Sequence, residues 1–117
     1  MALILYVEDH APAQMLMQAI ISDLTAHQLI VTGTGEAARK AASEYSPDLY
    51  IVDLDLPDTD GLALAQALKS IRPAPVLLVS AYGEAVKDET IRSVVTAYLA
   101  KPLDPIHVAE TIQRTLA

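Results

Sequence analysis

The sequence predicts an α/β fold: a doubly wound, three-layer (βα)5 sandwich around a five-stranded parallel sheet. Two observations support this fold class. Short apolar runs bounded by turn residues alternate along the chain with longer segments in which apolar residues recur at helical spacing. Repeated βα units with right-handed crossovers place helices on both faces of one sheet, with 2-1-3-4-5 as the expected strand order.

The predicted strands are short and almost entirely apolar, as expected of strands buried on both faces. They cover residues 3–7, 29–31, 49–52, 76–79 and 97–100. The first apolar run, LILYV, contains no turn residue and leads directly into two acidic residues. Prolines at 47, 73 and 75 separate the later strands from the helices before them.

Each predicted helix has a start signal, an apolar stripe, or both. The first starts near Pro12, the second after the capping residue Thr34, and the last after Asp104 and Pro105. The third covers residues 61–71 and the fourth residues 84–95. Inward-facing positions are expected, helix by helix, at Met15, Leu16, Ala19, Ile20 and Leu24; Ala37, Ala38, Ala41, Ala42 and Tyr45; Leu64, Ala65, Leu68 and Ile71; Val86, Thr90, Ile91 and Val94; Ile106, Ala109, Ile112 and Leu116.

Length and composition predict one domain spanning residues 1–117. The 52% of hydrophobic residues excludes a disordered acidic tail, and the net charge of −7 argues against direct nucleic-acid binding. No apolar run reaches the length of a membrane span, and no signal peptide is recognisable. Cysteine is absent, which excludes disulfides and thiolate metal sites. A cytoplasmic protein without membrane contact is therefore expected.

Polar residues follow four of the five predicted strands at their carboxyl ends. Glu8 and Asp9 follow the first strand, Asp53 the third, Ser80 the fourth and Lys101 the fifth. Because the carboxyl ends of parallel strands meet at one edge of the sheet, these side chains are expected to converge.

Three acidic side chains at one edge would repel one another unless a cation joined them. Mg²⁺ prefers hard oxygen ligands, so carboxylates and a backbone carbonyl suit it. A protonated lysine cannot ligate a metal but can contact a phosphoryl oxygen, and a serine hydroxyl can donate to another. The set indicates a phosphoryl-transfer site in which one carboxylate could act as nucleophile.

Four motifs, in this order and spacing, carry a family resemblance: YVED, VDLDLPDTDG, VSAYG and YLAKP. With them the chain resembles the receiver domains of two-component response regulators, which are chemotaxis-regulator-like and flavodoxin-like in fold, over essentially its whole length. The resemblance implies that Asp53 accepts a phosphoryl group from a histidine kinase or a histidine phosphotransfer protein. It also implies an unidentified downstream protein partner, and the net charge of −7 leads us to expect no direct contact with nucleic acid.

The same resemblance assigns roles to the remaining residues of the motifs. Mg²⁺ is expected on Asp9, Asp53, the backbone carbonyl of Asp55 and, through water, Glu8. Ser80 and Lys101 are expected to hold the phosphoryl oxygens, while Ser80 and Tyr98 form the conformational switch. The neighbours of the phosphoryl group are expected to be Ala81, Tyr82 and Pro102, with a cis bond between Lys101 and Pro102.

Some positions depart from the family pattern or have structural roles. Asp55 and Tyr82 occupy variable positions that tune the lifetime of the phosphoryl group in this family. A glycine common near Val94 is missing, which predicts a short or irregular fourth helix. Asp58 and Asp60 are expected to form the turn and the cap of the helix that begins near Gly61.

Three other functions are compatible with parts of the sequence. DLDLP resembles the nucleophile loop of haloacid-dehalogenase-like phosphatases, but Pro57 replaces the expected threonine or valine. An EF-hand starting at Asp53 fails because position 6 is Asp58 instead of glycine. A pseudo-receiver used only for docking is opposed by the intact acid, serine and lysine set. A stand-alone receiver is weakly preferred over a piece of a longer regulator or hybrid kinase, and the chain is expected to be a monomer or a phosphorylation-dependent dimer.

Overall fold

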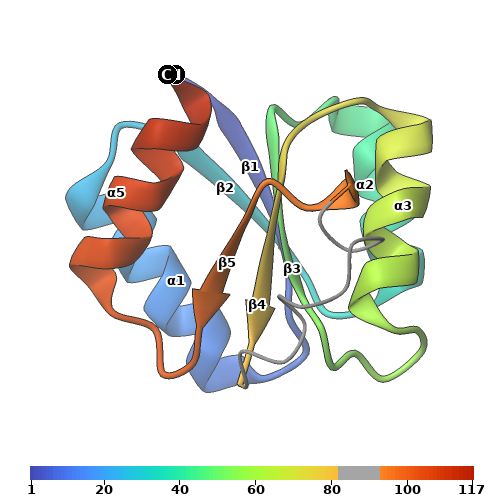
Figure 1. Ribbon diagram of the computed structural model, residues 1–117, viewed down its shortest axis with the longest axis horizontal. Coiled ribbons are helices and arrows are strands. Elements are labelled where there is room, and N and C mark those ends of the chain that lie inside the picture. The colour runs from blue at the N-terminus through green and yellow to red at the C-terminus, as the bar shows by residue number, and fades with distance from the viewer. Residues whose placement is uncertain (82–92) are drawn as a thin grey trace.

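The computed structural model describes residues 1–81 and 93–117, which contain a five-stranded parallel sheet (Figure 1). The strand order is β2-β1-β3-β4-β5, which confirms the predicted topology. The strands are β1 (Leu3–Val7), β2 (Gln28–Thr32), β3 (Leu49–Asp53), β4 (Val76–Ser80) and β5 (Ala97–Ala100). Every residue of β3 and β4 is buried, as their continuous apolar character predicted.

The helices form the two outer layers of the sandwich. They are α1 (Ala11–Leu24), α2 (Gly35–Tyr45), α3 (Gly61–Ile71) and α5 (Pro105–Leu116). Helices α1 and α5 cover one face of the sheet, and α2 and α3 cover the other (Figure 1). None of these described helices is long and apolar enough to cross a membrane. The helix predicted over residues 84–95 falls largely on residues 82–92, which lie outside the described residues.

Three predicted helix caps are confirmed. The Thr34 hydroxyl accepts the Ala37 N–H at 3.1 Å, at the start of α2. The Asp60 carboxylate accepts the Ala63 N–H at 2.7 Å and opens α3, and Asp104 caps α5 just before a proline. These side chains satisfy backbone donors that have no partner inside the helix.

The inward face of α1 was predicted correctly at Ile20 and wrongly at the other positions. The structure buries Met17, Ile20 and Ile21, whereas Met15 is 68% exposed and Leu16 38% exposed. Because α1 is apolar nearly all round, its sequence permits several stripes, and packing on the sheet selects one. Several other residues that were expected to face the core are also exposed, namely Ala19, Leu24, Ala37, Tyr45, Ile71 and Ile106.

The loop between β3 and α3 is tied to the start of α2 by Asp58. Its carboxylate accepts the N–H of Gly35 at 2.8 Å and that of Glu36 at 3.2 Å. These backbone donors lower the pKa of Asp58. Asp58 lies in the turn before α3, as expected, but its carboxylate serves the N-terminus of α2, which is more than 20 residues earlier in the sequence.

Replacing Asp58 by alanine is expected to lower the melting temperature, because two N–H groups at the start of α2 lose their acceptor. A lowered folded-state pKa means that this stabilisation is present above the ordinary pKa of aspartate and is lost as pH falls. Thermal unfolding at neutral pH and near pH 3 measures both effects. Glu44→Ala, at an exposed position of α2, is the matched control. Equal melting temperatures for the two variants at neutral pH would contradict the assignment.

Candidate functional site

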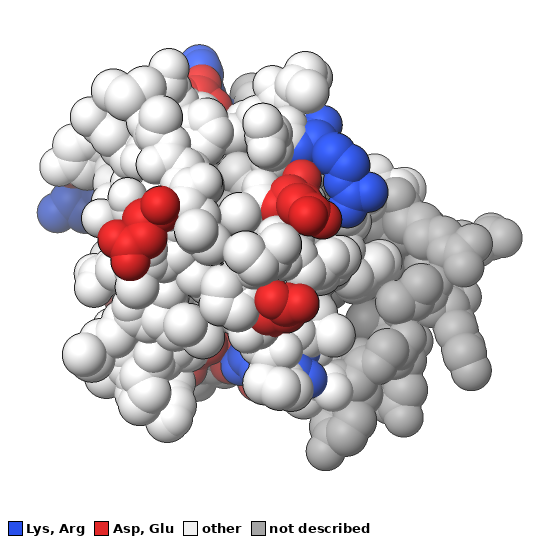
Figure 2. Space-filling view, turned by 90° about the vertical axis from the view of Figure 1, so that its left-hand side faces the viewer, with Lys and Arg blue, Asp and Glu red and all other residues white. Residues whose placement is uncertain are grey.

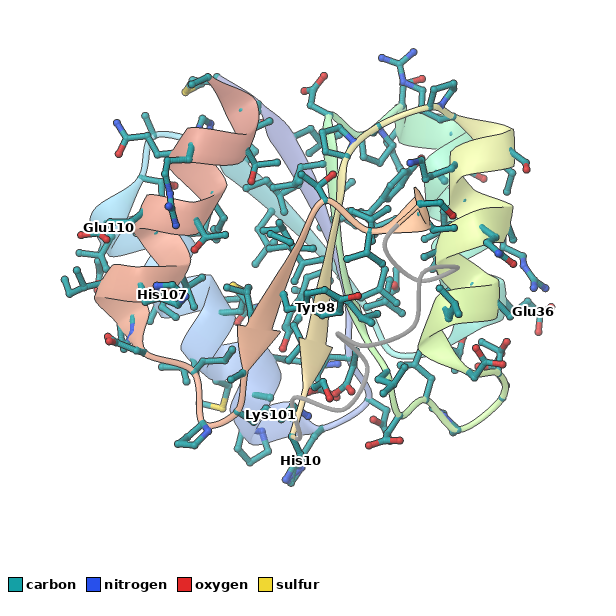
Figure 3. The ribbon with its side chains drawn as sticks, viewed as in Figure 1. His10, Glu36, Tyr98, Lys101, His107 and Glu110 are labelled. Atoms are coloured by element: carbon teal, nitrogen blue, oxygen red, sulfur yellow. The ribbon has the colours of Figure 1, made fainter. Side chains whose placement is uncertain are left out.

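The carboxyl ends of four strands bring together most of the predicted site residues. The register pairs Val7 with Val52, so Glu8 and Asp53 follow side by side on β1 and β3. On the other side of β3, β4 ends at Ser80, which pairs with Ala100 directly before Lys101. Figure 3 shows Lys101 at this end of the sheet, whereas Tyr98 lies further up β5. The predicted convergence of strand-end side chains is therefore found.

Lys101 bridges the two acidic residues of this edge. Its Nζ donates to Oδ2 of Asp53 at 2.6 Å and to Oε1 of Glu8 at 3.2 Å. Glu8 and Asp53 are each only 1% exposed, while the Lys101 side chain is 33% exposed. A buried pair of carboxylates is stable only with a compensating cation, and the ammonium group supplies that charge in this structure.

The protonation equilibria reflect this crowding of like charges. Burial, followed by contact with Asp53, raises the pKa of Glu8 to about 7. Burial alone would lower the pKa of Lys101, but its contacts with Asp53 and then Glu8 outweigh burial, so the pKa is raised. Lys101 therefore stays charged at neutral pH, where it faces the Asp53 carboxylate and a Glu8 carboxyl group that is close to the midpoint of its titration.

We expect Mg²⁺-free protein to lose stability through Glu8 as pH rises. The folded state holds the Glu8 proton more tightly than the unfolded state. Protonated Glu8 therefore contributes its full stabilisation of the folded state below pH 4.5, the ordinary pKa of a glutamate side chain. This stabilisation is lost as pH rises through about 7. After screening by solvent, the loss should be about 1–2 kcal/mol. Urea unfolding of wild type and Glu8→Gln across this pH range measures it. If the unfolding free energies of wild type and Glu8→Gln changed with pH in the same way, the assignment of this loss to Glu8 would be contradicted.

The other carboxylate oxygen of Asp53 is held by the loop that follows it. Oδ1 of Asp53 accepts the N–H of Asp55 at 2.9 Å, while the Asp55 side chain is exposed. The loop closes through a bridge between Asp55 and Asp60 and through the Gly61 N–H, which donates to the Leu54 carbonyl at 2.9 Å. Both Asp53 oxygens are thus oriented, one by the loop backbone and one by Lys101.

The remaining predicted residues occupy different environments. Ser80 is 7% exposed at the end of β4, and Tyr98 is half-buried against the core beneath α2 and α3. Asp9, Ala81 and Pro102 are exposed, and the Lys101–Pro102 bond is cis, as expected. Tyr82 lies outside the described residues.

The oxygen donors at this edge decide whether Mg²⁺ fits. Within residues 1–81 and 93–117, no three acidic or histidine side chains converge as metal ligands, and Asp9 stays exposed beside the buried pair. The oxygens present are nonetheless the hard donors that Mg²⁺ prefers: two adjacent carboxylates, a third one residue away and the nearby carbonyl of Asp55. The excess negative charge around Glu8 and Asp53 favours a cation. The residues fit the ion.

An open groove of about 300 Å³ lies beside Glu8 and Lys101. Its polar wall contains Glu8, His10 and Lys101, and its apolar wall contains Pro12, Ala13, Leu16, Pro102 and Leu103. On the face that Figure 2 shows, which is the left-hand side of Figure 1, charged side chains are few and scattered, and Asp23 is the only charged residue in the sequence of α1. The groove therefore combines access to Glu8 and Lys101 with an apolar contact surface.

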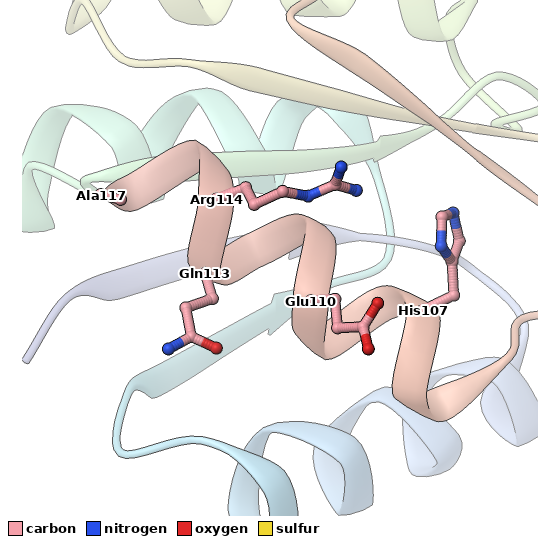
Figure 4. Close-up of a pocket in the computed structure, with 5 residues that line it drawn as sticks. All are labelled: His107, Glu110, Gln113, Arg114 and Ala117. Atoms are coloured by element: carbon pink, nitrogen blue, oxygen red, sulfur yellow. The ribbon is translucent and has the colours of Figure 1, made fainter.

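A larger depression of about 560 Å³ lies along α5 and is separate from the acidic pair (Figure 4). It is lined by His107, Glu110, Gln113, Arg114 and Ala117, all from the outer side of one helix. No strand end contributes to it, so the chemistry expected from the sheet edge is not available there.

The family model of the response regulator receiver domain matches residues 4–113. The chain belongs to this family. The receiver domain is 32% identical over 117 residues to the polar-differentiation response regulator DivK of Brucella ovis, covering 97% of the chain and 94% of DivK. It is also 32% identical over 105 residues to the transcriptional regulatory protein KdpE of Mycobacterium tuberculosis, covering 87% of the chain. It spans only 45% of the length of KdpE.

Solved structures agree with the fold of this receiver domain. The chemotaxis protein CheY4 of Vibrio cholerae superimposes with a TM-score of 0.90, at 23% identity and 99% coverage of both chains. The resemblance to response regulators, with a flavodoxin-like and chemotaxis-regulator-like fold, is therefore confirmed. The family match also favours a signalling domain over the phosphatase and calcium-binding alternatives.

Sequence reasoning missed two features of this receiver domain. The first is the contact of Asp58 with the start of α2, which has no sequence signal because the partners are distant in the chain. The second is Tyr6, a fully buried residue whose hydroxyl lacks a hydrogen-bond partner within the described part of the chain. Its position two residues before Glu8 was the available signal, since alternate residues of a strand share one face.

Proposed function

We propose that this receiver domain is a phosphoacceptor switch in which Asp53 takes a phosphoryl group from a phosphohistidine. The observation that carries the proposal is the buried pair of Glu8 and Asp53 bridged by Lys101 at the carboxyl edge of the sheet. A carboxylate in this position is a nucleophile with a cation already next to it. Membership of the receiver family supports the same chemistry.

In the proposed step, an Asp53 carboxylate oxygen forms a bond to phosphorus as the phosphorus–nitrogen bond of the donor breaks. The electron pair returns to the imidazole nitrogen of the donor, and the product is an acyl phosphate. Lys101, which now contacts Oδ2 of Asp53, would turn to a phosphoryl oxygen and offset its charge. The Asp55 N–H would keep the other Asp53 oxygen in place, and Ser80 would donate to a second phosphoryl oxygen.

Mg²⁺ is the proposed cofactor, as is general for the receiver family. Asp9, Asp53 and the backbone carbonyl of Asp55 would hold the ion, with Glu8 contributing through water. When bound, the ion would neutralise charge on the transferring phosphoryl group. Asp9 is exposed and could reach the ion by side-chain rotation, which suits a ligand that completes the site on binding.

The proposed donor is a histidine kinase or a histidine phosphotransfer protein. The groove beside Glu8 and Lys101 supports this assignment because its apolar wall offers a docking surface next to the acceptor. A donor segment seated there would exclude water while its phosphohistidine approached Asp53. The expected setting is the cytoplasm, and the acidic net charge of −7 is unfavourable for direct nucleic-acid contact.

The proposed output is a change in a protein-binding surface. Movement of Ser80 toward the phosphoryl group would leave space that Tyr98 could enter from its half-buried position on β5. The surface formed by β5 and α5 would then change for a downstream protein or for a second copy of the chain.

The test is incubation with acetyl phosphate and Mg²⁺, followed by intact-mass measurement. Wild type should gain one phosphoryl group, Asp53→Asn should gain none, and EDTA should prevent the gain. Asp55→Asn is the matched control, because it removes an exposed carboxylate two residues away and should still be phosphorylated. No gain in wild type, or an equal gain in Asp53→Asn, would refute the proposal and favour a domain used only for docking.

A further inference from the structure

Tyr6 is a buried aromatic residue that the proposed phosphoryl transfer does not use. It lies in β1 two residues before Glu8, so the two side chains point to the same face of the sheet. That face lies beneath α1 and α5, where Tyr6 belongs to a core cluster with Met17 and Leu99. Its hydroxyl is therefore a polar group within an apolar layer directly behind the acidic edge.

The hydroxyl of Tyr6 has no hydrogen-bond partner among residues 1–81 and 93–117. The other fully buried tyrosine, Tyr50, behaves differently, because its hydroxyl donates to the carbonyl oxygen of Arg72 at 2.7 Å. A buried polar group without a partner is unfavourable and requires an explanation. Use of the hydroxyl in another state of the site would provide one.

The Glu8 carboxylate is a suitable acceptor for this hydroxyl. A tyrosine hydroxyl keeps its proton at neutral pH, so Tyr6 is a donor, and Glu8 lies close enough to interact with this hydroxyl. Oε1 of Glu8 accepts from Lys101 at 3.2 Å, whereas Oε2 accepts from the His10 N–H at the long distance of 3.4 Å. Glu8 can therefore accept a further and stronger hydrogen bond.

We propose that Tyr6 is a positioning residue whose hydroxyl donates a hydrogen bond to Glu8 when Lys101 turns from Glu8 to a phosphoryl group on Asp53. This inference rests on the proposed function. When Lys101 turns away, Glu8 loses one hydrogen-bond donor. The Tyr6 hydroxyl would then donate to the Glu8 carboxylate and keep it oriented toward the proposed Mg²⁺ site. Tyr6 would act through Glu8 and would not touch the phosphoryl group.

The experiment compares wild type, Tyr6→Phe and the matched control Tyr50→Phe, which removes a hydroxyl that is already bonded. Without Mg²⁺, Tyr6→Phe should unfold at or above the wild-type temperature, and Tyr50→Phe below it. Phosphorylation by acetyl phosphate is then followed by intact mass at increasing Mg²⁺ concentrations. The Mg²⁺ concentration for half-maximal phosphorylation should rise about tenfold in Tyr6→Phe and stay unchanged in Tyr50→Phe. An unchanged Mg²⁺ requirement, or a loss of Mg²⁺-free stability equal to that of Tyr50→Phe, would overturn the proposal.

A second measurement does not depend on phosphorylation. In Lys101→Met at alkaline pH, Glu8 has already lost its lysine, so the Tyr6 hydroxyl should donate to it. The near-ultraviolet absorption band of Tyr6 is obtained by subtracting the spectrum of a protein with Tyr6→Phe from that of the same protein with Tyr6, once with Lys101 and once with Lys101→Met. With Lys101→Met, this band should lie at longer wavelength than in wild type. An unshifted band would overturn the role of Tyr6. If wild type takes no phosphoryl group, the proposed function fails, and this band still decides the role of Tyr6.

Discussion

Replacement of Lys101 by methionine is expected to slow phosphorylation of Asp53 on the order of a hundredfold, because the cation next to the acceptor oxygen is lost. The present contact is 2.6 Å from Nζ to Oδ2 of Asp53, and the same group reaches Glu8 at 3.2 Å. Rates follow from intact mass against time with acetyl phosphate and Mg²⁺. A rate within a factor of about three of wild type would exclude Lys101 from the reaction.

The same substitution should also destabilise the Mg²⁺-free protein, on the order of 2 kcal/mol at pH 8, because two buried carboxylates lose their cation. Solvent reaches a third of the Lys101 side chain and keeps the effect moderate. The loss of unfolding free energy in Lys101→Met should become smaller toward pH 5, because Glu8, whose pKa is raised, takes up a proton in the folded state. Lys40→Met, at an exposed position of α2, is the control and should change neither rate nor stability.

Gly61→Ala is expected to destabilise the domain by about 2–3 kcal/mol and to reduce phosphorylation together with stability. A Cβ at Gly61 would lie 2.7 Å from Cα of Leu54 and still closer to the Asp53 carbonyl oxygen. Both are backbone atoms and cannot rotate away. The loop that orients Asp53 would have to shift, so urea unfolding and phosphorylation should both report the change.

Gly33→Ala is the matched control for the loop. A Cβ at Gly33 would have no neighbour closer than 3.9 Å, which is ordinary van der Waals distance. Its unfolding free energy and its phosphorylation should stay near wild type. Similar losses in both variants would show that the close approach at Gly61 is not the cause.

Most of the fold could be predicted because the strands and the helix starts are encoded locally. Continuous apolar runs marked all five strands, and Thr34, Asp60 and Asp104 capped the described helices where expected. The inward face of α1 could not be predicted in the same way. Its apolar residues encircle the helix, so the burial of Met17 in place of Met15 depends on packing against the sheet.

The candidate site was predictable as a set of residues, since the parallel topology places every strand end at one edge. Its contacts were less predictable. Lys101 was expected to contact a phosphoryl group, and in this structure it holds Glu8 and Asp53 together. Asp58 reaches back to the start of α2, a pairing across more than 20 residues that no local pattern encodes.

The sequence by itself determined which chemical groups stand at the carboxyl edge: two adjacent acids after β1, one at the end of β3, a hydroxyl at the end of β4 and a lysine after β5. The tertiary structure decided which of these groups contact one another and which are buried from solvent. It buried Glu8 and Asp53 but left Asp9 exposed, and it placed the Tyr6 hydroxyl behind the acids without a partner among the described residues. The reason is physical. Local sequence patterns mark where the strands lie along the chain. The burial of a side chain, and with it the charge balance of the site, depends on which surfaces meet when the layers pack.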